Sequence, residues 1–364
     1  MSVVVGAQRL VQRIEALDES VGQRLTALER AIDDVRHRSG AAQSEAREQI
    51  GTLARDVRGV LERQAPVANL SAQVAELKAE LNQVARRQEE ILAYLAARLN
   101  TLVGAHSIYL GDHVALTFLD DGQRIYVDTR DVGISSHLLS YGRWEPQYVS
   151  LFRRLVRPGA RVLDLGANQG VYTLIAASAS APGGEVHAFE ANPHLAQLTT
   201  RSVQINGHGA RAHVHALAVG EAEGVAHLSF DDAWSGGGSV RDAGGGGTTA
   251  CRVVALDDVF ADGSFTVDVI KMDVEGSEGR ALRGMRQLLT RSVGVVMMIE
   301  FAPEMLAGMG TPAPDVTALL AGLGFRAWTI RDDATLEVAS WSDLAALREG
   351  VRNILVSRHD PFPG

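Results

Sequence analysis

The chain has little of several features that would define other classes of protein. It contains a single cysteine, Cys251, which excludes a disulfide framework and a cysteine-rich metal site. No apolar run approaches the roughly eighteen residues that a membrane-spanning helix needs. The N-terminus lacks the basic stretch and apolar core of a signal peptide. We therefore expect a cytoplasmic protein without a transmembrane segment.

The chain also has no excess of basic charge, since its 35 Lys and Arg residues are outnumbered by 44 Asp and Glu residues. The net charge of −9 and the isoelectric point near 5.7 argue against a nucleic-acid-binding surface, which would be basic. The chain also lacks an N-P-P-[YF] motif of the kind that nucleic-acid methylation uses, so we expect no nucleic-acid partner. Its 364 residues, 46% of them apolar, are enough for one sizeable core and an extension.

The N-terminal third, from about residue 7 to residue 101, is poor in glycine and proline and rich in Ala, Arg, Glu, Gln and Leu. Its apolar residues recur at steps of three and four, which is the heptad spacing of a coiled coil. Two steps of four, at Leu17, Val21 and Leu25, form a stutter that locally unwinds a supercoil. The seam resumes at Val67 with Gln88 as its polar member. It consists of Leu10, Ile14, Leu17, Val21, Leu25, Leu28, Ile32 and Val35, and then Val67, Leu70, Val74, Leu77, Leu81, Val84, Ile91 and Leu95.

Between these two stretches, residues 38–51 are weakly patterned and Pro66 should kink or split a helix. A single helix with so narrow an apolar stripe gains little stability alone, whereas association buries the stripe. We therefore predict a helical coiled coil over residues 1–103 that assembles the chain into a homo-oligomer. A helical hairpin that folds back on itself is the alternative.

From His106 to Asp131 the period of the apolar residues changes to two, which is typical of strands. Asp120, Asp121 and Gly122 form a good hairpin turn between two of these strands. The pattern predicts a small β-hairpin segment over residues 104–134, ahead of a larger domain over residues 135–364.

The most informative stretch of that domain is V-L-D-L-G-A-N-Q-G-V-Y-T at residues 162–173, which predicts a buried strand, a glycine-rich turn and the start of a helix. Gly166 and Gly170 would allow a sharp turn and a close approach of ligand to backbone. The turn has neither the G-x-G-x-x-G dinucleotide fingerprint nor the G-K-[ST] of a P-loop. Asp164, at the strand end, instead suits a ligand with a cationic centre and a free amino group, such as S-adenosylmethionine.

A second acid, Glu190, ends the next predicted strand, E-V-H-A-F-E at residues 185–190. In nucleotide-binding α/β folds an acid at this place accepts hydrogen bonds from the ribose hydroxyls. We therefore expect Asp164 and Glu190 to lie side by side at the carboxyl edge of a parallel sheet. The alternative is an ordinary glycine-rich turn flanked by two solvated acids.

Four segments, D-L-G-A-N-Q-G-V-Y-T-L, A-F-E-A-N-P, A-L-D-D-V-F and D-V-I-K-M-D-V-E-G-S-E, together resemble the FkbM family of S-adenosylmethionine-dependent O-methyltransferases, over residues 142–357. Only A-N-P at 191–193 departs from the usual P-N-P or P-x-P. The resemblance implies an α/β fold with the seven-stranded sheet of a class I (Rossmann-like) methyltransferase. Its third strand would span residues 212–219, and residues 325–330 and 351–357 would form antiparallel sixth and seventh strands. Asp257 or Asp258 should cap the helix that follows them.

The resemblance also implies S-adenosylmethionine as the cofactor. A G-x-[WY]-E-P lead-in similar to the family's would lie over it, which makes Trp144 and Glu145 candidate contacts; the alternative for Trp144 is packing. A glycine-rich loop at 236–247 could fold over substrate or be a simple insertion. The predicted cofactor-binding residues are Glu145, Asp164, Gly166, Ala167, Asn168, Gly170, Tyr172 and Glu190.

Methyl transfer to oxygen requires that a hydroxyl lose its proton or bind a metal. Asp273 and Glu300 end adjacent predicted strands, and as hard oxygen ligands they suit Mg²⁺, an arrangement similar to the metal site of catechol-type O-methyltransferases. Without a metal, either carboxylate could be the general base, with Lys271 orienting the hydroxyl; Lys271 could also be only a buried ion-pair partner of Asp273 or Glu275. His137 is the runner-up base. Glu278 could cap or pair with the next helix.

We expect an S-adenosylmethionine-dependent O-methyltransferase that acts on a hydroxyl of a sugar, in a surface polysaccharide or glycolipid, or on a related natural product. An oligomeric stalk favours a polymeric acceptor and could dock to a membrane-associated glycan assembly complex. The alternative is a coiled-coil scaffold whose methyltransferase-like domain does not turn over, although intact Asp164, Gly166, Gly170, Glu190 and Asp273 argue against it. The acceptor hydroxyl, the need for a metal and the oligomer number stay open.

Overall fold

The computed structural model describes residues 107–229, 239–241 and 248–362, together with the isolated positions 52, 83, 86–88 and 91. The chain divides into two compact units, residues 1–91 and 92–364. The predicted coiled coil over residues 1–103 and most of the glycine-rich loop at 236–247 fall outside the described residues, so both stay predictions. Among the residues that are described, no helix has both the length and the apolar character needed to cross a bilayer.

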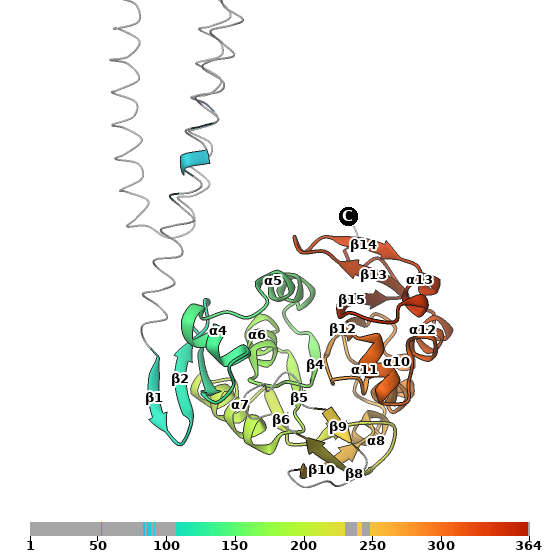
Figure 1. The fold of residues 1–364 in the computed structure, drawn as a ribbon, viewed down its shortest axis with the longest axis horizontal. Helices are drawn as coiled ribbons and strands as arrows, with labels where there is room; N and C mark the ends of the chain where they lie inside the picture. The colour runs from blue at the N-terminus through green and yellow to red at the C-terminus, as the bar shows by residue number, and fades with distance from the viewer. Residues whose placement is uncertain are drawn as a thin grey trace, which may run out of the picture. The chain divides into compact units, whose positions relative to one another are not determined.

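An eight-stranded sheet forms the centre of the second unit, in the order β14-β13-β15-β12-β11-β4-β5-β6 (Figure 1). Its strands are β4 Arg161–Leu165, β5 Glu185–Phe189, β6 Ala212–His215, β11 Val269–Met272, β12 Val296–Phe301, β13 Arg326–Ile330, β14 Leu336–Ala339 and β15 Arg352–Ser357. The five strands from β12 to β6 are parallel, and β15 lies antiparallel between β12 and β13. This order confirms the Rossmann-like class I methyltransferase fold, with β14 as one additional edge strand.

Two details of the predicted sheet are wrong. Of the expected sixth and seventh strands only β15 opposes the parallel strands, because β13 pairs antiparallel with β15 and so shares the direction of the others. The expected third strand at 212–219 ends at His215. Its remainder, β7 Ala218–Val219, pairs with β10 in a separate sheet of order β7-β10-β8-β9. That sheet also contains β8 Gly224–Ser229, β9 Ser239–Arg241 and β10 Thr248–Val254.

Helices cover both faces of the large sheet, because successive strand residues point to opposite faces. On β4, for example, Val162 packs into one buried cluster and Leu163 into the other. The first cluster contains the helices before and after β4, which are α4 Ile134–Tyr141, α5 Pro146–Leu155, α6 Val171–Ala179 and α7 Pro193–Ile205. The second contains α8 Leu256–Val259, α9 Glu278–Arg283, α10 Arg286–Arg291, α11 Pro303–Gly308, α12 Ala313–Gly322 and α13 Trp341–Ala346.

The strands expected between His106 and Asp131 are present as an antiparallel sheet of order β1-β2-β3. They are β1 Ile108–Gly111, β2 Val114–Phe118 and β3 Arg124–Asp128. Ile125 and Val127 are fully buried in the same cluster as Phe152 of α5. The open edge of β3 is satisfied by α7, since Tyr126 N donates to Ser202 Oγ at 2.9 Å. The small sheet therefore packs directly on the methyltransferase unit.

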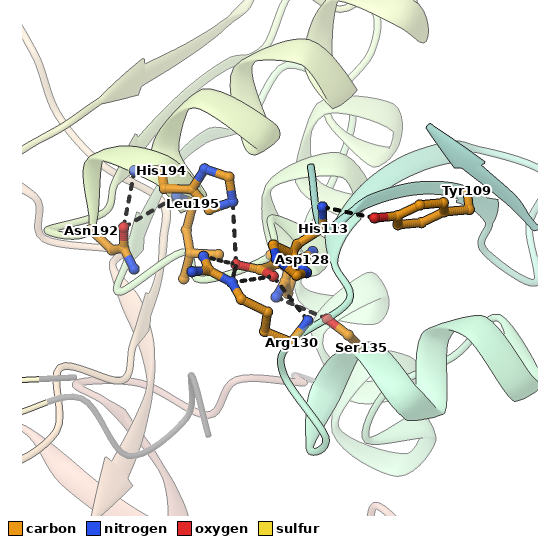
Figure 2. Close-up of polar contacts among 9 residues, drawn as sticks. Tyr109, His113, Asp128, Arg130, Ser135, Asn192, His194 and Leu195 are labelled. Carbon is orange, nitrogen blue, oxygen red and sulfur yellow. Dashed lines mark hydrogen bonds and ion pairs between the residues drawn. The ribbon is translucent and has the colours of Figure 1, made fainter. Parts of the chain in front are cut away.

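An ion-pair network also joins β3 to the first turn of α7 (Figure 2). Asp128 Oδ2 lies 2.6 Å from Arg130 Nη2 and 3.2 Å from His194 Nε2. Asn192 caps the same turn, because its Oδ1 accepts the backbone N–H of His194 at 3.0 Å and of Leu195 at 3.4 Å. The network fixes the start of α7 beside the carboxyl edge of the large sheet, where Asn192 and Leu195 line a cavity.

The L-D-D element caps a helix, but not the one that was predicted. Asp257 lies inside α8, and its two carboxylate oxygens accept the backbone N–H of Gln287 at 3.0 Å and of Leu288 at 2.8 Å. These N–H groups belong to the first turn of α10, some thirty residues further along the chain. Asp257 therefore ties two helices together rather than starting its own.

Candidate active site

A cavity of about 260 Å³ opens at the carboxyl ends of β4, β5, β11 and β12, the edge where α/β folds bind ligands. Eight of the predicted cofactor-binding and catalytic residues line it, and among them are Asn168, Glu190, Lys271, Asp273 and Glu300. Gly166, Ala167 and Tyr172 also line it. The other predicted site residues, Gly170, Asp164, Glu145 and His137, lie behind or beside these lining groups.

The two glycines of the turn are required by the protein's own packing. Gly166 has φ +80°, and a Cβ there would lie 1.8 Å from the carbonyl oxygen of Asp273. Gly170 has φ +86°, and a Cβ there would lie 2.6 Å from Thr199 Cγ2. Their missing side chains therefore let the turn after β4 pack against the turn after β11 and against α7, while a close approach of a ligand to this backbone stays a prediction.

Asp164 does not line the cavity. Its carboxylate is 1% exposed and accepts a hydrogen bond from Thr173 Oγ1 at 2.5 Å. Burial raises its pKa to about 6. In this geometry Asp164 holds the first turn of α6 onto the end of β4, and it supports the glycine turn from beneath.

Glu190 lines the cavity and organises the turn above it. Its Oε2 accepts the backbone N–H of Asn168 at 2.7 Å, and its Oε1 accepts that of Asn192 at 2.8 Å. Asn168 has φ +50°, so the turn presents this N–H in the left-handed conformation that asparagine tolerates better than most residues. Burial raises the pKa of Glu190 to about 7. Each carboxylate oxygen keeps a second lone pair, which a ligand hydroxyl can use.

Lys271 lies at the floor of the site and is only 2% exposed. Its Nζ is 2.9 Å from Asp273 Oδ2 and 5.1 Å from the centre of the Tyr172 ring. Burial lowers the pKa of Lys271, but the neighbouring carboxylates of Asp273 and Glu145 outweigh it, and the net shift is upward. The ammonium therefore stays charged and anchors Asp273, the ion pair that was the alternative reading of Lys271.

Two more carboxyl groups surround this pair. Burial, together with the charge of Asp273, raises the pKa of Glu300 to about 8, and Glu300 shares a hydrogen bond with Asp273. The same causes raise the pKa of Glu275 to about 9. Like charges at close range cannot all ionise, so this end of the cavity holds at least one proton near neutral pH.

The lead-in before α5 closes the same end. Tyr172 Oη donates to Glu145 Oε2 at 2.9 Å, and burial raises the pKa of both groups. Trp144 lines the cavity. His137 is exposed and packs edge-on against Trp144, with ring centres 5.4 Å apart, and its Nδ1 lies 3.0 Å from Gly133 O. His137 itself does not line the cavity, so the structure does not bring it to the acidic cluster.

The donor set does not support the Mg²⁺ prediction for Asp273 and Glu300. Asp273 already pairs with the Lys271 ammonium, and Glu300 bonds to Asp273. Within the described part of the chain, no group of three or more His, Cys, Asp or Glu side chains is arranged to hold a metal ion. We therefore derive no step through a metal.

The cavity does fit S-adenosylmethionine. One end is apolar, with Phe189, Leu217 and Val219, and the other is acidic, as a nucleoside joined to a sulfonium requires. Ser277 supplies a further polar atom, since its buried Oγ has no partner within the described residues and the residue lines the cavity.

Several lining residues were not predicted as site residues, among them Gln169, Glu275 and Ser277. Gln169 is 1% exposed; its Nε2 donates to Ser135 Oγ at 3.0 Å and its Oε1 accepts Asp128 N at 3.3 Å, which ties the small sheet to the glycine turn. Glu275 enters the cavity because it adopts φ +53°. Ser277 follows in the same loop. The run D-V-E-G-S-E marks the loop, but no local pattern tells which of its side chains turn inward.

Glu278, the remaining acid of that run, is buried and lies outside the cavity lining. Its Oε1 accepts the backbone N–H of Val274 at 3.0 Å and of Gly276 at 3.3 Å. Burial raises its pKa to about 7. Glu278 therefore holds the loop that carries Asp273 and Glu275 in shape.

Residues 164–327 match the family model described as the methyltransferase FkbM domain. A search of the curated proteins found no match.

Solved structures similar to this chain include three methyltransferases. An O-methyltransferase from Bacillus cereus, solved in complex with S-adenosylhomocysteine, is 15% identical, with 59% of this chain and 81% of that chain covered and a TM-score of 0.35. An S-adenosylmethionine-dependent O-methyltransferase from Thermotoga maritima is 13% identical, with 67% and 77% covered and a TM-score of 0.33. A methyltransferase from Aquifex aeolicus is 15% identical, with 58% and 87% covered and a TM-score of 0.31.

Proposed function

The chain is a methyltransferase with an FkbM domain at residues 164–327, and we propose that it methylates a hydroxyl group of a sugar, in a polysaccharide, a glycolipid or a related natural product. The observation that carries this proposal is the carboxyl pair of Asp273 and Glu300, which lines the acidic end of the cavity and is anchored by the buried Lys271. Such a pair can take a proton from a hydroxyl.

A general base works best when its pKa lies near the pH at which it operates. Glu300, with a pKa of about 8, meets this condition. Lys271 fixes Asp273 in one position, and Asp273 in turn bonds to Glu300. We assign the removal of the acceptor's proton to the pair of Asp273 and Glu300. The hydroxyl donates a hydrogen bond to a carboxylate oxygen of the pair, and the proton passes to that oxygen as the new carbon–oxygen bond forms.

The remaining residues bind and orient. When bound, S-adenosylmethionine supplies an electrophilic methyl group on a sulfonium centre. Glu190 would accept hydrogen bonds from the ribose hydroxyls, and Phe189, Leu217 and Val219 would enclose the adenine. Gly166, Ala167 and Asn168 line the cavity and would hold the cofactor with their turn. Tyr172 and Glu145 fix the lead-in that carries Trp144.

The charge of the site favours a neutral, hydroxyl-rich acceptor. Asp273, Glu275 and Glu300 line the acidic end of the cavity against the single ammonium of Lys271. Carboxyl groups exchange hydrogen bonds with sugar hydroxyls, whereas a phosphorylated or carboxylated acceptor would meet only the ammonium of Lys271, which is already paired with Asp273. This supports a neutral sugar at the position that is methylated.

The N-terminal residues 1–103 extend the proposal. Their heptad pattern supports a coiled-coil homo-oligomer that presents several active sites to one polymer, in the cytoplasm or docked to a membrane-associated glycan assembly complex. Mass measurement of the full chain in solution tests the oligomer.

The function is tested in two steps. Isothermal titration of the full chain with S-adenosylmethionine should release or absorb heat, and transfer of labelled methyl groups to a panel of monosaccharides, disaccharides and activated sugars should follow. Binding without transfer to any oxygen would overturn O-methylation of sugars. Absence of cofactor binding would favour a non-catalytic scaffold. Repeating the transfer with a chelator should leave the rate unchanged, because the donor set does not fit a metal.

A further inference from the structure

A second cavity, of about 340 Å³, adjoins the active site and is not accounted for by the cofactor or the reacting hydroxyl. It lies between the loop after β2 and helix α5. Trp144 and Val171 line both cavities. The two spaces therefore share a wall, and a ligand longer than one ring could reach from one into the other past Trp144.

The second cavity adjoins the reactive end of the active site. Trp144 precedes Glu145, which accepts a hydrogen bond from Tyr172 Oη at 2.9 Å, and the Tyr172 ring centre lies 5.1 Å from Lys271 Nζ, the partner of Asp273. This wall therefore lies near the carboxyl pair. The apolar end adjoins a different cavity, which shares Ala218 and Val219 with it. When the hydroxyl of an acceptor reaches Asp273 and Glu300, the rest of the acceptor would therefore extend past Trp144 into the second cavity.

The walls of the second cavity combine an apolar surface with polar groups of balanced charge. Leu119, Val149 and Ile175 supply the apolar part. Asp120, Asp121, Arg143 and Arg153 supply the polar part, two acids and two bases. A sugar ring has apolar C–H faces and a rim of hydroxyls, so it matches such a mixture, whereas a strongly charged ligand would need an excess of one sign.

The polar groups are partly preorganised. Arg153 Nη2 lies 2.5 Å from Asp121 Oδ2, which holds its guanidinium against the loop. Asp120 N donates to Gly142 O at 2.8 Å, and Gly142 has φ +64° with space for no Cβ, since one would lie 2.7 Å from Phe118 O. These contacts fix the lead-in to Trp144 on the β2 loop. Arg143 is exposed and makes no hydrogen bond or ion pair with any residue the structure describes.

We propose that this second cavity is a subsite for the sugar ring next to the one that is methylated, and that the enzyme acts on a ring within a glycan chain rather than on a free monosaccharide. The proposal rests on the proposed function and adds to it: Trp144 is the platform between two successive rings, and Arg143 and Arg153 bind hydroxyls of the second ring.

The test compares acceptors of one and two rings on the full chain. The probes are glucose, mannose, galactose and rhamnose, each as monosaccharide and as disaccharide. In wild-type protein the second ring should raise kcat/KM by about tenfold or more for at least one pair, because binding energy from a remote ring can be used in the transition state. Saturation-transfer NMR with the same disaccharides measures binding without turnover.

Two variants target the second cavity alone. Ser150→Phe fills it from the exposed face of α5, and Arg143→Ala removes the free guanidinium; neither residue lines the active-site cavity. Both should abolish the gain from the second ring and leave the monosaccharide rate within about twofold. Ser140→Phe, at an exposed serine of α4 outside both cavities, is the matched control and should change neither. Thermal unfolding checks that the variants fold.

The outcomes separate the two proposals. Equal kcat/KM for one and two rings in every pair, or a gain that persists in both variants, overturns the subsite and leaves the sugar methyltransferase intact. Disaccharide binding that Ser150→Phe abolishes, with no methyl transfer to any sugar, supports the subsite and overturns the proposed reaction. Neither binding nor transfer overturns both.

Discussion

The ammonium of Lys271 lies 2.9 Å from Asp273 Oδ2 and is almost completely shielded from solvent. The chain has only two lysines, Lys78 and Lys271, and its other 33 residues counted as Lys or Arg are arginines. A compact ammonium fits a narrow buried site that a guanidinium fork would overfill. This buried cation holds the Asp273 side chain in place beside Glu275 and Glu300, whose pKa values are raised by burial and by the charge of Asp273.

Asp273→Asn should separate chemistry from cofactor binding. The change keeps the shape of the side chain but removes the negative charge that pairs with Lys271. It also replaces one oxygen acceptor of the Asp273–Glu300 pair with an amide nitrogen. We expect kcat to fall by about a hundredfold or more, the usual contribution of a general base, and the affinity for S-adenosylmethionine to stay nearly constant. Single-turnover rates and calorimetry measure the two quantities. Loss of both together would assign Asp273 to cofactor support.

The pH dependence of turnover should follow the carboxyl pair. Because the base must be deprotonated and the pKa of Glu300 is about 8, the rate should rise with pH and level off above that value. Lys271 lowers the pKa of Glu300, so Lys271→Met should move the midpoint upward by roughly one unit or more. Arg283→Met, at a partly exposed arginine paired with Glu221, is the control. A midpoint that stays put in Lys271→Met would contradict the assignment.

Glu275 should make the folded protein less stable as pH rises. Its pKa is raised from an ordinary 4.5 to about 9, so the folded state retains a proton that the unfolded state releases between those values. Unfolding then releases a proton, and the free energy of unfolding falls as pH increases through this window. Glu275→Gln should flatten the dependence of Tm on pH between about 5 and 9. An unchanged slope would show that Glu275 is solvated in the folded state.

Gly166→Ala tests the contact between the two loops. The added Cβ combines a left-handed backbone, which costs roughly 1–2 kcal/mol, with an overlap on Asp273 O, which costs roughly 1–3 kcal/mol more. Gly159→Ala is the matched control, because Gly159 has φ +83° and nothing within 4 Å of its Cβ position. Chemical denaturation should therefore show a larger loss for Gly166→Ala. Equal losses would mean that backbone strain alone makes Gly166 necessary.

Asp257→Ala should cost about 1 kcal/mol of stability, the typical value for loss of an N-terminal helix cap. The cost arises at α10, because the carboxylate of Asp257 accepts N–H groups of Gln287 and Leu288. Asp258→Ala, at the exposed neighbouring acid, should change stability by no more than about 0.5 kcal/mol. Hydrogen exchange can locate the effect: faster exchange at α10 is expected, and faster exchange confined to α8 would contradict the cap.

Much of the fold is determined by local patterns in the sequence. The strand and helix alternation after residue 160, the glycine turn at 166–170 and the acids that end β4, β5 and β12 are all written in short segments, because buried parallel strands need apolar runs and turns need glycine. Together with the resemblance to the FkbM family, those features predicted the class I methyltransferase sheet and placed Glu190, Asp273 and Glu300 at strand ends along one edge.

Only the tertiary structure decided which of these groups face the cavity. Asp164 turns into the core to meet Thr173, Gly166 makes room for Asp273, and Asp257 caps a helix thirty residues away. Each of these contacts joins segments that are distant in sequence or depends on where a loop bends, and no periodicity encodes such a meeting. The sequence by itself therefore determined the sheet and its reactive edge, while packing between loops determined the roles of the residues along that edge.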